Sequence, residues 1–540
     1  MWRKILPLSL LGVGLSYFAC LVGRFTRDIC FDDFFITAVY GRHLREHGAF
    51  FWNTSGRLVD GFSSFLDVVV KALLPGSDPL FSAALTNVAW HALAAILLLF
   101  LLFREEALSS RGDVLRAVLA VVALIFSPPL VDASSFLLEG TMFADFLLLS
   151  LLLLDPVRGG AWSASLFSAA VLAMTLSRPE GLAFAAVFLW FWWRSSLKRF
   201  PLLPLIIVGL VLSAYFFWHI RTFGYWAPNT YYAKSSDRRI LEVLDGARYV
   251  WRFLSSPFGA LSAISLVLAS MGLVGATRRW RAATALFWGS LAIVIFSGGD
   301  CYGNPRERAE ECFRFLVVPA VLSPFLLALF VSRTRRLPRM LATALLGSLA
   351  FVSACGMWTR FYAAHGEDGS QALRFPSLRD DCPFDQEIAE KLRAAVPNPT
   401  IAHTDYQRIK YFFDAASTRD LTGLVDSHIA HRPYPAQNLW GKHDLAAAMI
   451  IQPDFWQIGS PSPQSESVAA YSATDVMFSD ELFVRFFGRF FQTHPPSQSF
   501  RKGVFAQYTF ASVATKGGFF NFLVRRDVVS RATPLLVSVE

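Results

Sequence analysis

Long runs of apolar residues dominate the first two thirds of the chain. A run of about 20 such residues can cross the hydrocarbon core of a bilayer as a helix. Short polar or basic stretches separate one run from the next. The pattern predicts a polytopic α-helical membrane protein with about eleven transmembrane helices. The predicted spans are residues 5–23, 80–103, 114–131, 136–154, 162–177, 182–194, 201–220, 258–276, 282–297, 315–332 and 340–356.

Two of these spans, 162–177 and 182–194, are short, and the polar stretch 178–181 separates them. They represent either two helices or one broken pair, and the second case would reverse the side of every later loop. The first span follows only two basic residues and lacks a small-residue cleavage site. We therefore expect a retained anchor rather than a signal peptide.

The last third of the chain differs from the first part. After residue 356 polar residues are regular, Pro is frequent, and no run is long enough to span a membrane. Helical periodicity over 386–396, a short strand at 400–403 and a hairpin over 503–526 predict a mixed α/β domain. The predicted organisation is a transmembrane domain over 1–356 and a soluble α/β domain over 357–540.

Composition narrows the class of protein further. Of 540 residues, 54% are hydrophobic and only 17% are charged, whereas a soluble domain has about 25% charged residues. The 51 Phe and 15 Trp are too many for one soluble core. With only six Cys, the chain is not a disulfide scaffold either.

The formal net charge of +9 is mainly a signal of topology. If the N-terminus is inside, the short connections 104–113, 155–161, 194–200, 277–281 and 333–339 are cytoplasmic, and Lys or Arg dominate all but the first, as the positive-inside rule requires. The long connections 24–79, 221–257 and 298–314 and the α/β domain then lie outside. We therefore expect no nucleic-acid partner.

Polar residues gather in these outer connections. Asp32 and Asp33 follow the first span, and two adjacent carboxylates suit a general base or a ligand for a divalent metal such as Mg²⁺ or Mn²⁺. Alternatively, Asp33 caps the amphipathic helix that Phe34 to His47 predicts, and that helix lies on the membrane surface.

Other acids and cations occur in the same connections or at the ends of the spans. Each has a structural alternative: Arg178 and Glu180 can pair with each other, Tyr and Trp near residue 225 can belong to an aromatic belt, and a rim Arg can extend its charge to water. The further candidates are Asp60, Glu139, Arg178, Glu180, Arg221, Asn229, Lys234, Asp300 and Arg314.

Convergence of these groups suits one reaction at the outer membrane surface. A carboxylate would activate an acceptor hydroxyl, and cations would stabilise a departing phosphate. Because no soluble nucleotide is available outside the cell, we expect a lipid-linked donor. The chain has no Gly-x-x-x-x-Gly-Lys-Ser/Thr loop and no His-Glu-x-x-His helix, which argues against an ATP-driven machine and a zincin metalloprotease.

Several motifs resemble a known family. Asp32-Asp33-x-x-Ile36, Val59-Asp60-Gly61-Phe62-Ser63-Ser64, Arg178-Pro179-Glu180-Gly181, Pro228-Asn229-Thr230-Tyr231-Tyr232-Ala233-Lys234, Gly298-Gly299-Asp300 and Arg314-Phe315-Leu316-Val317-Val318-Pro319 follow one another along the chain. They resemble bacterial GT-C glycosyltransferases, in the branch that contains the mycobacterial terminal arabinofuranosyltransferase of arabinogalactan. The stretch 420–430 resembles the extracytoplasmic domain of that branch.

The resemblance implies a GT-C fold, a polyprenyl-phosphate-linked sugar donor and a catalytic carboxylate at Asp32 or Asp33, with Asp32 the first choice as base. The sequence departs from the family pattern at two places. Leu-Leu-Glu-Gly-Thr replaces Gly-Leu-Glu-Thr at Glu139, which weakens the transfer of a role to Glu139, and Asp67 replaces an aromatic residue, which leaves the acceptor and the sugar open. Outside the cytosol, Cys301 and Cys312 form either a disulfide or two free thiols.

The predicted function is a membrane glycosyltransferase that moves a sugar, arabinofuranose by resemblance, to an extracytoplasmic glycan or glycoconjugate. Arg221, Lys234 and Arg314 are expected to hold the donor phosphate. Asp60, Glu139, Arg178, Glu180, Asn229 and Asp300 are expected to contact the substrates. The expected location is the bacterial inner membrane, with membrane lipid around the spans and the site on the outer side.

Two other classes of protein remain open. A transporter or flippase of lipid-linked glycans would have polar residues through mid-span positions and an internal repeat, which the sequence lacks. A glycan-binding scaffold would tolerate neutralisation of Asp32 and Asp33.

Overall fold

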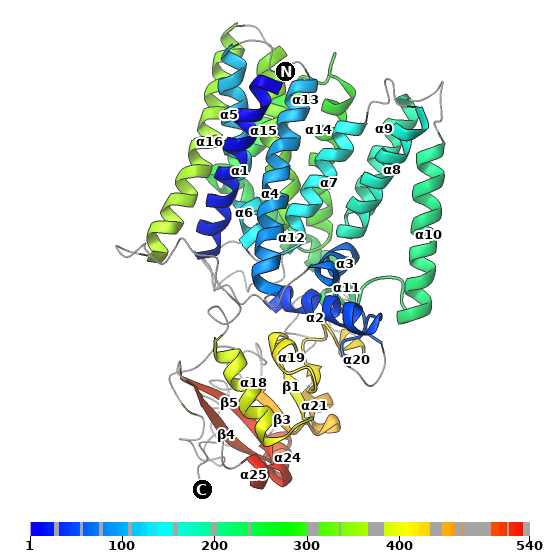
Figure 1. The fold of residues 1–540 in the computed structure, drawn as a ribbon, viewed down its shortest axis with the longest axis vertical. Coiled ribbons are helices and arrows are strands. Elements are labelled where there is room, and N and C mark those ends of the chain that lie inside the picture. The colour runs from blue at the N-terminus through cyan, green and yellow to red at the C-terminus, as the bar shows by residue number, and fades with distance from the viewer. Residues whose placement is uncertain are drawn as a thin grey trace.

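The structure is a computed structural model in which helices fill one part of the molecule and a small α/β domain the other (Figure 1). It describes residues 2–25, 32–53, 58–74, 79–105, 111–135, 137–154, 160–195, 202–235, 239–299, 313–333, 336–365, 383–404, 406–431, 445–458, 467, 498–515 and 518–532. The N-terminus lies at the end of the helices away from the α/β domain (Figure 1).

Every predicted span overlaps a helix, which confirms the helical class. The helices of this part of the chain are α1 (Trp2–Phe25), α2 (Asp32–His47), α3 (Phe65–Leu73), α4 (Pro79–Arg104), α5 (Arg111–Ile125), α6 (Pro128–Ser135), α7 (Gly140–Leu153), α8 (Gly160–Ser177), α9 (Gly181–Ser195), α10 (Leu203–Phe223), α11 (Asn229–Lys234), α12 (Arg239–Ser255), α13 (Pro257–Met271), α14 (Arg278–Phe296), the 3₁₀ turn η1 (Arg314–Leu316), α15 (Val317–Arg333) and α16 (Arg336–His365).

Among the described residues, four helices are long and apolar enough to cross a membrane, or up to six if each of two bent pairs is one span. Helices α1, α7, α8 and α9 contain apolar stretches of only 10–17 residues, which are shorter than this criterion requires. The short spans 162–177 and 182–194 are two separate helices, α8 and α9, which pack against each other.

Three predicted boundaries are wrong. The span 114–131 is broken, because α5 ends at Ile125 and α6 begins at Pro128 with a 49° bend. Pro128 and Pro129 lack the amide donors that would continue the helix. The span 258–276 ends at Met271, and α16, the helix of the last predicted span, continues past 356 to His365.

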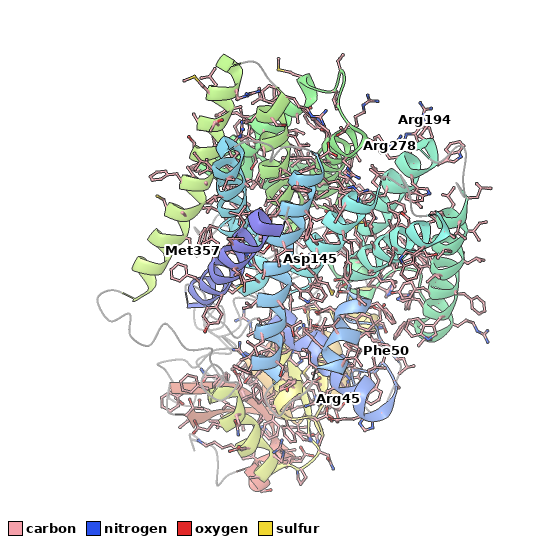
Figure 2. All side chains as sticks on the ribbon, turned by 45° about the horizontal axis from the view of Figure 1, so that its top comes forward. Arg45, Phe50, Asp145, Arg194, Arg278 and Met357 are labelled. Atoms are coloured by element: carbon pink, nitrogen blue, oxygen red, sulfur yellow. The ribbon has the colours of Figure 1, made fainter. Side chains whose placement is uncertain are left out.

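The end of the bundle away from the α/β domain carries much of the basic charge, as Arg194 and Arg278 illustrate (Figure 2). Part of this charge is paired. Glu105 accepts from Arg279 Nη1 at 2.8 Å and from Arg333 Nη2 at 3.2 Å. Both Glu105 and Arg279 are buried, so this pair ties α4 to the start of α14.

Inside the bundle, Asp145 of α7 is 1% exposed and lies among the helices (Figure 2). A carboxylate this deep in a helix bundle usually faces the interior, away from lipid.

The α/β domain is built on one mixed sheet of order β2-β1-β3-β5-β4. β1 pairs in parallel with β2 and β3, and β5 is antiparallel to β3 and β4. The predicted strand at 400–403 is confirmed, but the predicted hairpin over 503–526 begins later, because a helix occupies its first residues. The elements are α18 (Pro383–Ala395), β1 (Thr400–His403), α19 (Arg408–Phe412), β2 (Ser417–Asp420), α20 (Ser427–Ala430), α21 (Leu445–Ile451), β3 (Phe455–Ile458), α24 (Gln498–Gln507), β4 (Tyr508–Thr515), β5 (Gly518–Arg525) and α25 (Arg526–Ala532).

Helix α2 lies across the junction between the bundle and the α/β domain (Figure 1). It packs against α3 on the bundle side and against α19 of the α/β domain. Residues 34–41 and His43 are all buried, so α2 is enclosed by protein on both sides. The predicted helix is confirmed, but it is a connecting layer rather than one lying on the surface.

An ion cluster around Asp414 joins α2 to the α/β domain. The Asp414 carboxylate accepts from Arg42 Nη2 at 2.8 Å, contacts His43 Nε2 at 2.9 Å and lies 3.5 Å from Lys410 Nζ. His43 Nδ1 faces the Phe51 carbonyl at 2.8 Å, so both ring nitrogens face oxygen acceptors. We call these four side chains, Arg42, His43, Lys410 and Asp414, the junction cluster.

A second polar contact runs beside the junction cluster. Trp52 Nε1 donates to Thr418 Oγ1 at 2.7 Å. The Asn53 amide group pairs with the Thr418 backbone in both directions, at 2.9 and 3.0 Å. The loop after α2 is therefore held along β2.

We predict that Asp414→Asn weakens the junction in a pH-dependent manner. Burial opposes ionisation of Asp414, but the hydrogen bond from His43 and the charges of Arg42 and Lys410 outweigh it and hold its pKa below the usual range. The stabilisation is therefore present above about pH 4, the unfolded-state pKa, and is lost as the pH falls further. At pH 7 the variant should lose about 1 kcal/mol, a value reduced for partial exposure.

Thermal unfolding of the purified protein at pH 7 and pH 3 measures this. The gap between wild type and variant should narrow at the lower pH. Asp527→Asn, which removes an exposed partner of Arg525, is the matched control and should change stability by less than about 0.5 kcal/mol. An equal gap at both pH values would contradict the role of Asp414.

Candidate functional site

A cavity opens at the junction of the bundle and the α/β domain. It has about 600 Å³ of empty space, including part of its opening to solvent. Stretches that are far apart in the sequence meet there. Its lining residues are Asp33, Ile36, Thr37, Gly61, Phe62, Ser63, Ser64, Leu138, Glu139, Arg178, Thr230, Lys234, Arg314, Phe315 and Leu424.

An acid and a cation from opposite ends of the helical part pair in this cavity. Arg314 Nη1 donates to Asp33 Oδ2 at 2.7 Å. The Arg314 side chain is 4% exposed and that of Asp33 is 18% exposed, so water screens the pair only partly. Asp33 is the second residue of α2, and Arg314 begins η1 immediately before α15.

A second guanidinium lines the same cavity. Arg178 Nη1 donates to Glu139 Oε1 at 3.0 Å, and Arg178 Nε donates to Glu180 Oε1 at 2.5 Å. The simple pairing of Arg178 with Glu180 is therefore present, and a third segment joins it through Glu139. Arg178 lies in the turn between α8 and α9, and Glu139 precedes α7.

Phe315 lies close to both guanidinium groups. The centroid of its ring is 5.1 Å from Arg178 Cζ and 5.3 Å from Arg314 Cζ. Cations are attracted to the face of an aromatic ring, so one ring contacts both groups. Three cations line the cavity, Arg178, Arg314 and Lys234, and guanidinium and ammonium groups suit the binding of an anion.

Two of the expected substrate residues lie behind the cavity wall instead of on it. Asp60 accepts from Asn229 N at 2.8 Å and pairs with His219 Nε2. Burial raises the pKa of Asp60 to about 6, against the opposing hydrogen bonds from His219 and Asn229. Their chain neighbours Gly61 and Thr230 are the lining residues.

Asn229 also reaches the α/β domain. Its Nδ2 donates to the carbonyls of Gly423 at 2.6 Å and Leu424 at 3.0 Å. Because Asn229 begins α11, whose Thr230 and Lys234 line the cavity, this contact fixes one wall of the cavity to the α/β domain.

The remaining candidates have different positions. Arg221 is exposed in the last turn of α10 and is not among the lining residues. The side chain of Asp32 lies outside the described residues, although its backbone begins α2. Asp300, Cys301 and Cys312 also lie outside the described residues.

A smaller second cavity adjoins the first and shares Leu138 and Glu139 with it. It contains a buried pair in α3, in which Lys71 Nζ donates to Asp67 Oδ2 at 2.8 Å. The sequence carried a signal for this pair, because an acid and a Lys four residues apart interrupt an apolar helix. Leu424 and Phe315 had no such signal, since apolar residues of this kind are common throughout the chain.

The described residues do not form a metal site, and the side chain of Asp32, one of the two predicted ligands, lies outside them. In the described part of the chain, no group of three His, Cys, Asp or Glu side chains is arranged to hold a metal ion. The carboxylate of Asp33 is paired with Arg314. Binding of Mg²⁺ or Mn²⁺ by Asp32 and Asp33 therefore stays a prediction.

No protein-family model and no curated protein sequence matches the chain. Among solved structures, the chain is similar to ArnT from Cupriavidus metallidurans bound to undecaprenyl phosphate, with 14% identity, a TM-score of 0.44, and 76% of this chain and 85% of that chain covered. The same protein in the apo state gives 12% identity, a TM-score of 0.46 and coverage of 96% and 98%.

An archaeal oligosaccharyltransferase, AglB from Archaeoglobus fulgidus in complex with an inhibitory peptide and a dolichol-phosphate, gives 11% identity and a TM-score of 0.45. That match covers 96% of this chain and 74% of the other. Likenesses of this degree carry no argument about the reaction or the substrate.

We predict that Gly61→Ala opens this cavity wall. A Cβ at Gly61 would lie 2.3 Å from Val425 Cγ1 and 3.2 Å from the Leu424 carbonyl oxygen, so the two segments must separate. Overpacking of this kind costs about 1–3 kcal/mol. Thermal unfolding measures the loss of stability.

Gly347→Ala is the matched control, because nothing lies within 4 Å of a Cβ at that helical position. Ala should stabilise the helix there by about 0.5–1 kcal/mol. Equal unfolding temperatures for Gly61→Ala and wild type would show that the two segments do not pack this closely.

Proposed function

We propose that this chain is a membrane glycosyltransferase. It transfers a sugar from a polyprenyl-phosphate donor to an extracytoplasmic cell-envelope glycan or glycoconjugate. The observation that carries the proposal is the contact of Asp33 with Arg314 in a cavity between apolar helices and an α/β domain. The motif resemblance supports arabinofuranose as the sugar.

The cations of the cavity suit a lipid-linked phosphate. Arg314 and Arg178 both place planar guanidinium groups near the ring of Phe315, and Lys234 lines the same cavity. Guanidinium groups bind phosphate oxygens through paired N–H donors. In the proposed complex these cations stabilise the negative charge that develops on the leaving phosphate. Arg221, which is not a lining residue, has a secondary place in this proposal.

The proposed chemical step moves one glycosyl group. A carboxylate of the acidic pair removes the proton from an acceptor hydroxyl, and the acceptor oxygen attacks the anomeric carbon. The bond between that carbon and the phosphate oxygen breaks, and polyprenyl phosphate leaves with the electron pair. Asp32 is the first choice as base, and Asp33 holds Arg314 in position through their 2.7 Å contact.

The two acids can be separated by kinetics. With radiolabelled polyprenyl-phosphoryl-arabinofuranose and a synthetic alkyl arabinofuranoside as acceptor, Asp32→Asn should lower kcat by about 100-fold or more, as expected for loss of a general base. Asp33→Asn should instead raise the KM for the donor, because Arg314 loses its partner. Product is measured as new glycosidic linkage in detergent solution, where flipping across a bilayer is impossible.

Glu105→Gln is the matched control, since it also breaks a buried acid–arginine pair but at the far end of the bundle. It should retain turnover per folded molecule. Full transfer by both Asp32→Asn and Asp33→Asn would remove the proposed base. A wild-type protein that moves the lipid-linked sugar across vesicles without forming a linkage would favour the flippase.

The proposed location is the bacterial inner membrane, with the cavity and the α/β domain outside. Two exposed residues can test the orientation: Ile450 in α21 is 82% exposed, and Val274, between α13 and α14, is 98% exposed. In a chain whose six natural cysteines are replaced by serine, a membrane-impermeant maleimide should label Ile450→Cys in intact spheroplasts. Val274→Cys should react only after permeabilisation, and the reverse pattern would contradict the orientation.

A further inference from the structure

One turn of the α/β domain forms part of the cavity wall. Of the described lining residues, Leu424 alone comes from the α/β domain. Leu424 is 1% exposed and belongs to an apolar cluster with Val39, Tyr40 and Phe62 of the helical part. The turn that carries Leu424, residues 420–426, connects β2 to α20.

Asp420 holds this turn together from within. Its carboxylate accepts from Thr422 N at 2.9 Å, Thr422 Oγ1 at 2.6 Å, Leu424 N at 2.7 Å and Val425 N at 3.3 Å. Asp420 is fully buried, and hydrogen bonds to a carboxylate are among the stronger ones in proteins. Gly423 has a φ of +85°, which residues other than glycine adopt only with strain.

The helical part holds the same turn from the other side. Asn229 Nδ2 donates to the carbonyls of Gly423 and Leu424, while Asn229 N donates to Asp60. Val425 packs so closely on Gly61 that no Cβ fits between them. The position of Leu424 is therefore fixed by polar contacts on both sides.

The donor and the acceptor of the proposed reaction approach the cavity from different sides, and this turn lies on the side of the acceptor. A polyprenyl chain stays in the bilayer, so its phosphate reaches the cavity from the apolar helices. The α/β domain lies beyond the end of those helices (Figure 1). An extracytoplasmic acceptor therefore approaches along the wall that contains Leu424.

We propose that Leu424 determines specificity for the acceptor, and that Asp420 and Asn229 are positioning residues that hold Leu424 in the cavity wall. This inference rests on the proposed function. A rigid apolar side chain sets the shape of its wall and excludes acceptors that would overlap it, whereas the cations that hold the donor phosphate lie on other segments.

The test compares the effect of each variant on the KM for the acceptor with its effect on the KM for the donor. Using the donor and acceptor named above, Leu424→Ala and Leu424→Phe should each change the KM for the acceptor by about tenfold, a typical effect of altered apolar contact. The KM for the donor should stay within about twofold of the wild-type value. The Leu424→Met variant, which conserves the side-chain volume, should keep the wild-type KM for the acceptor. Asp420→Asn should raise the KM for the acceptor in the same selective way, whereas Asn229→Ala should raise both KM values, because Asn229 also begins α11, which carries Lys234.

Leu421→Ala is the matched control. Leu421 belongs to the same turn and is fully buried, but it packs in the core of the α/β domain instead of lining the cavity. It should lower the unfolding temperature and leave the KM for the acceptor unchanged.

The outcomes separate the two claims. If the wild-type protein transfers sugar but the Leu424 variants leave the KM for the acceptor unchanged, or change both KM values equally, the inference is wrong and the glycosyltransferase function stands. If the wild-type protein forms no glycosidic linkage from the lipid-linked donor, the proposed function fails and the inference fails with it.

Discussion

Buried charges at the junction must be paired, and this requirement holds the two parts of the molecule together. Asp33 pairs with Arg314, and Arg42 pairs with Asp414. Removing one partner of a fully buried pair costs about 3–5 kcal/mol, and the partial exposure of Asp414 lowers the cost at that pair to about 1 kcal/mol. The Asp33–Arg314 pair joins the start of α2 to the turn before α15, and the Arg42–Asp414 pair joins α2 to the α/β domain.

The pairing also gives α2 its unusual environment. A helix beside a membrane commonly keeps one face in water, but α2 buries residues 34–41 between α3 and α19. Its last turn, with Arg45 and Glu46, stays exposed, whereas Asp33, Arg42 and His43 pair with charged groups of other segments. A change in the seating of the α/β domain would therefore move Asp33 as well.

Much of the helical part could be predicted from the sequence, because apolar length is a local property. The helix α4 could be predicted from its own apolar run, without information about the segments that pack against it. The break at Pro128 was missed, although a proline pair cannot supply the amide donors of a continuous helix. The partners of Asp60 and Asn229 could not be predicted, because their contacts join segments separated by 159 to 195 residues.

Charge counts were informative for a different reason. The positive-inside rule depends on the residues that flank the spans, and it needs no information about pairing. Arg279 and Arg333 nevertheless share Glu105, so part of the basic charge that indicates topology also holds helices together. Sequence reasoning could not separate these two roles, because Glu105 lies more than 170 positions from both arginines.

The two parts of the molecule contribute different kinds of residue to the cavity, and each kind has its own role in the proposed reaction. The helical part contributes every charged lining residue described, and the α/β domain contributes Leu424. Charges act on the phosphate and the acceptor hydroxyl, which are common to all reactions with polyprenyl-phosphate donors. An apolar wall discriminates between acceptors only by their shape. Acceptor selection can therefore change through the turn at 420–426 while Arg178, Arg314 and Asp33 keep their contacts, provided that Asp420 and Asn229 still hold the turn in place.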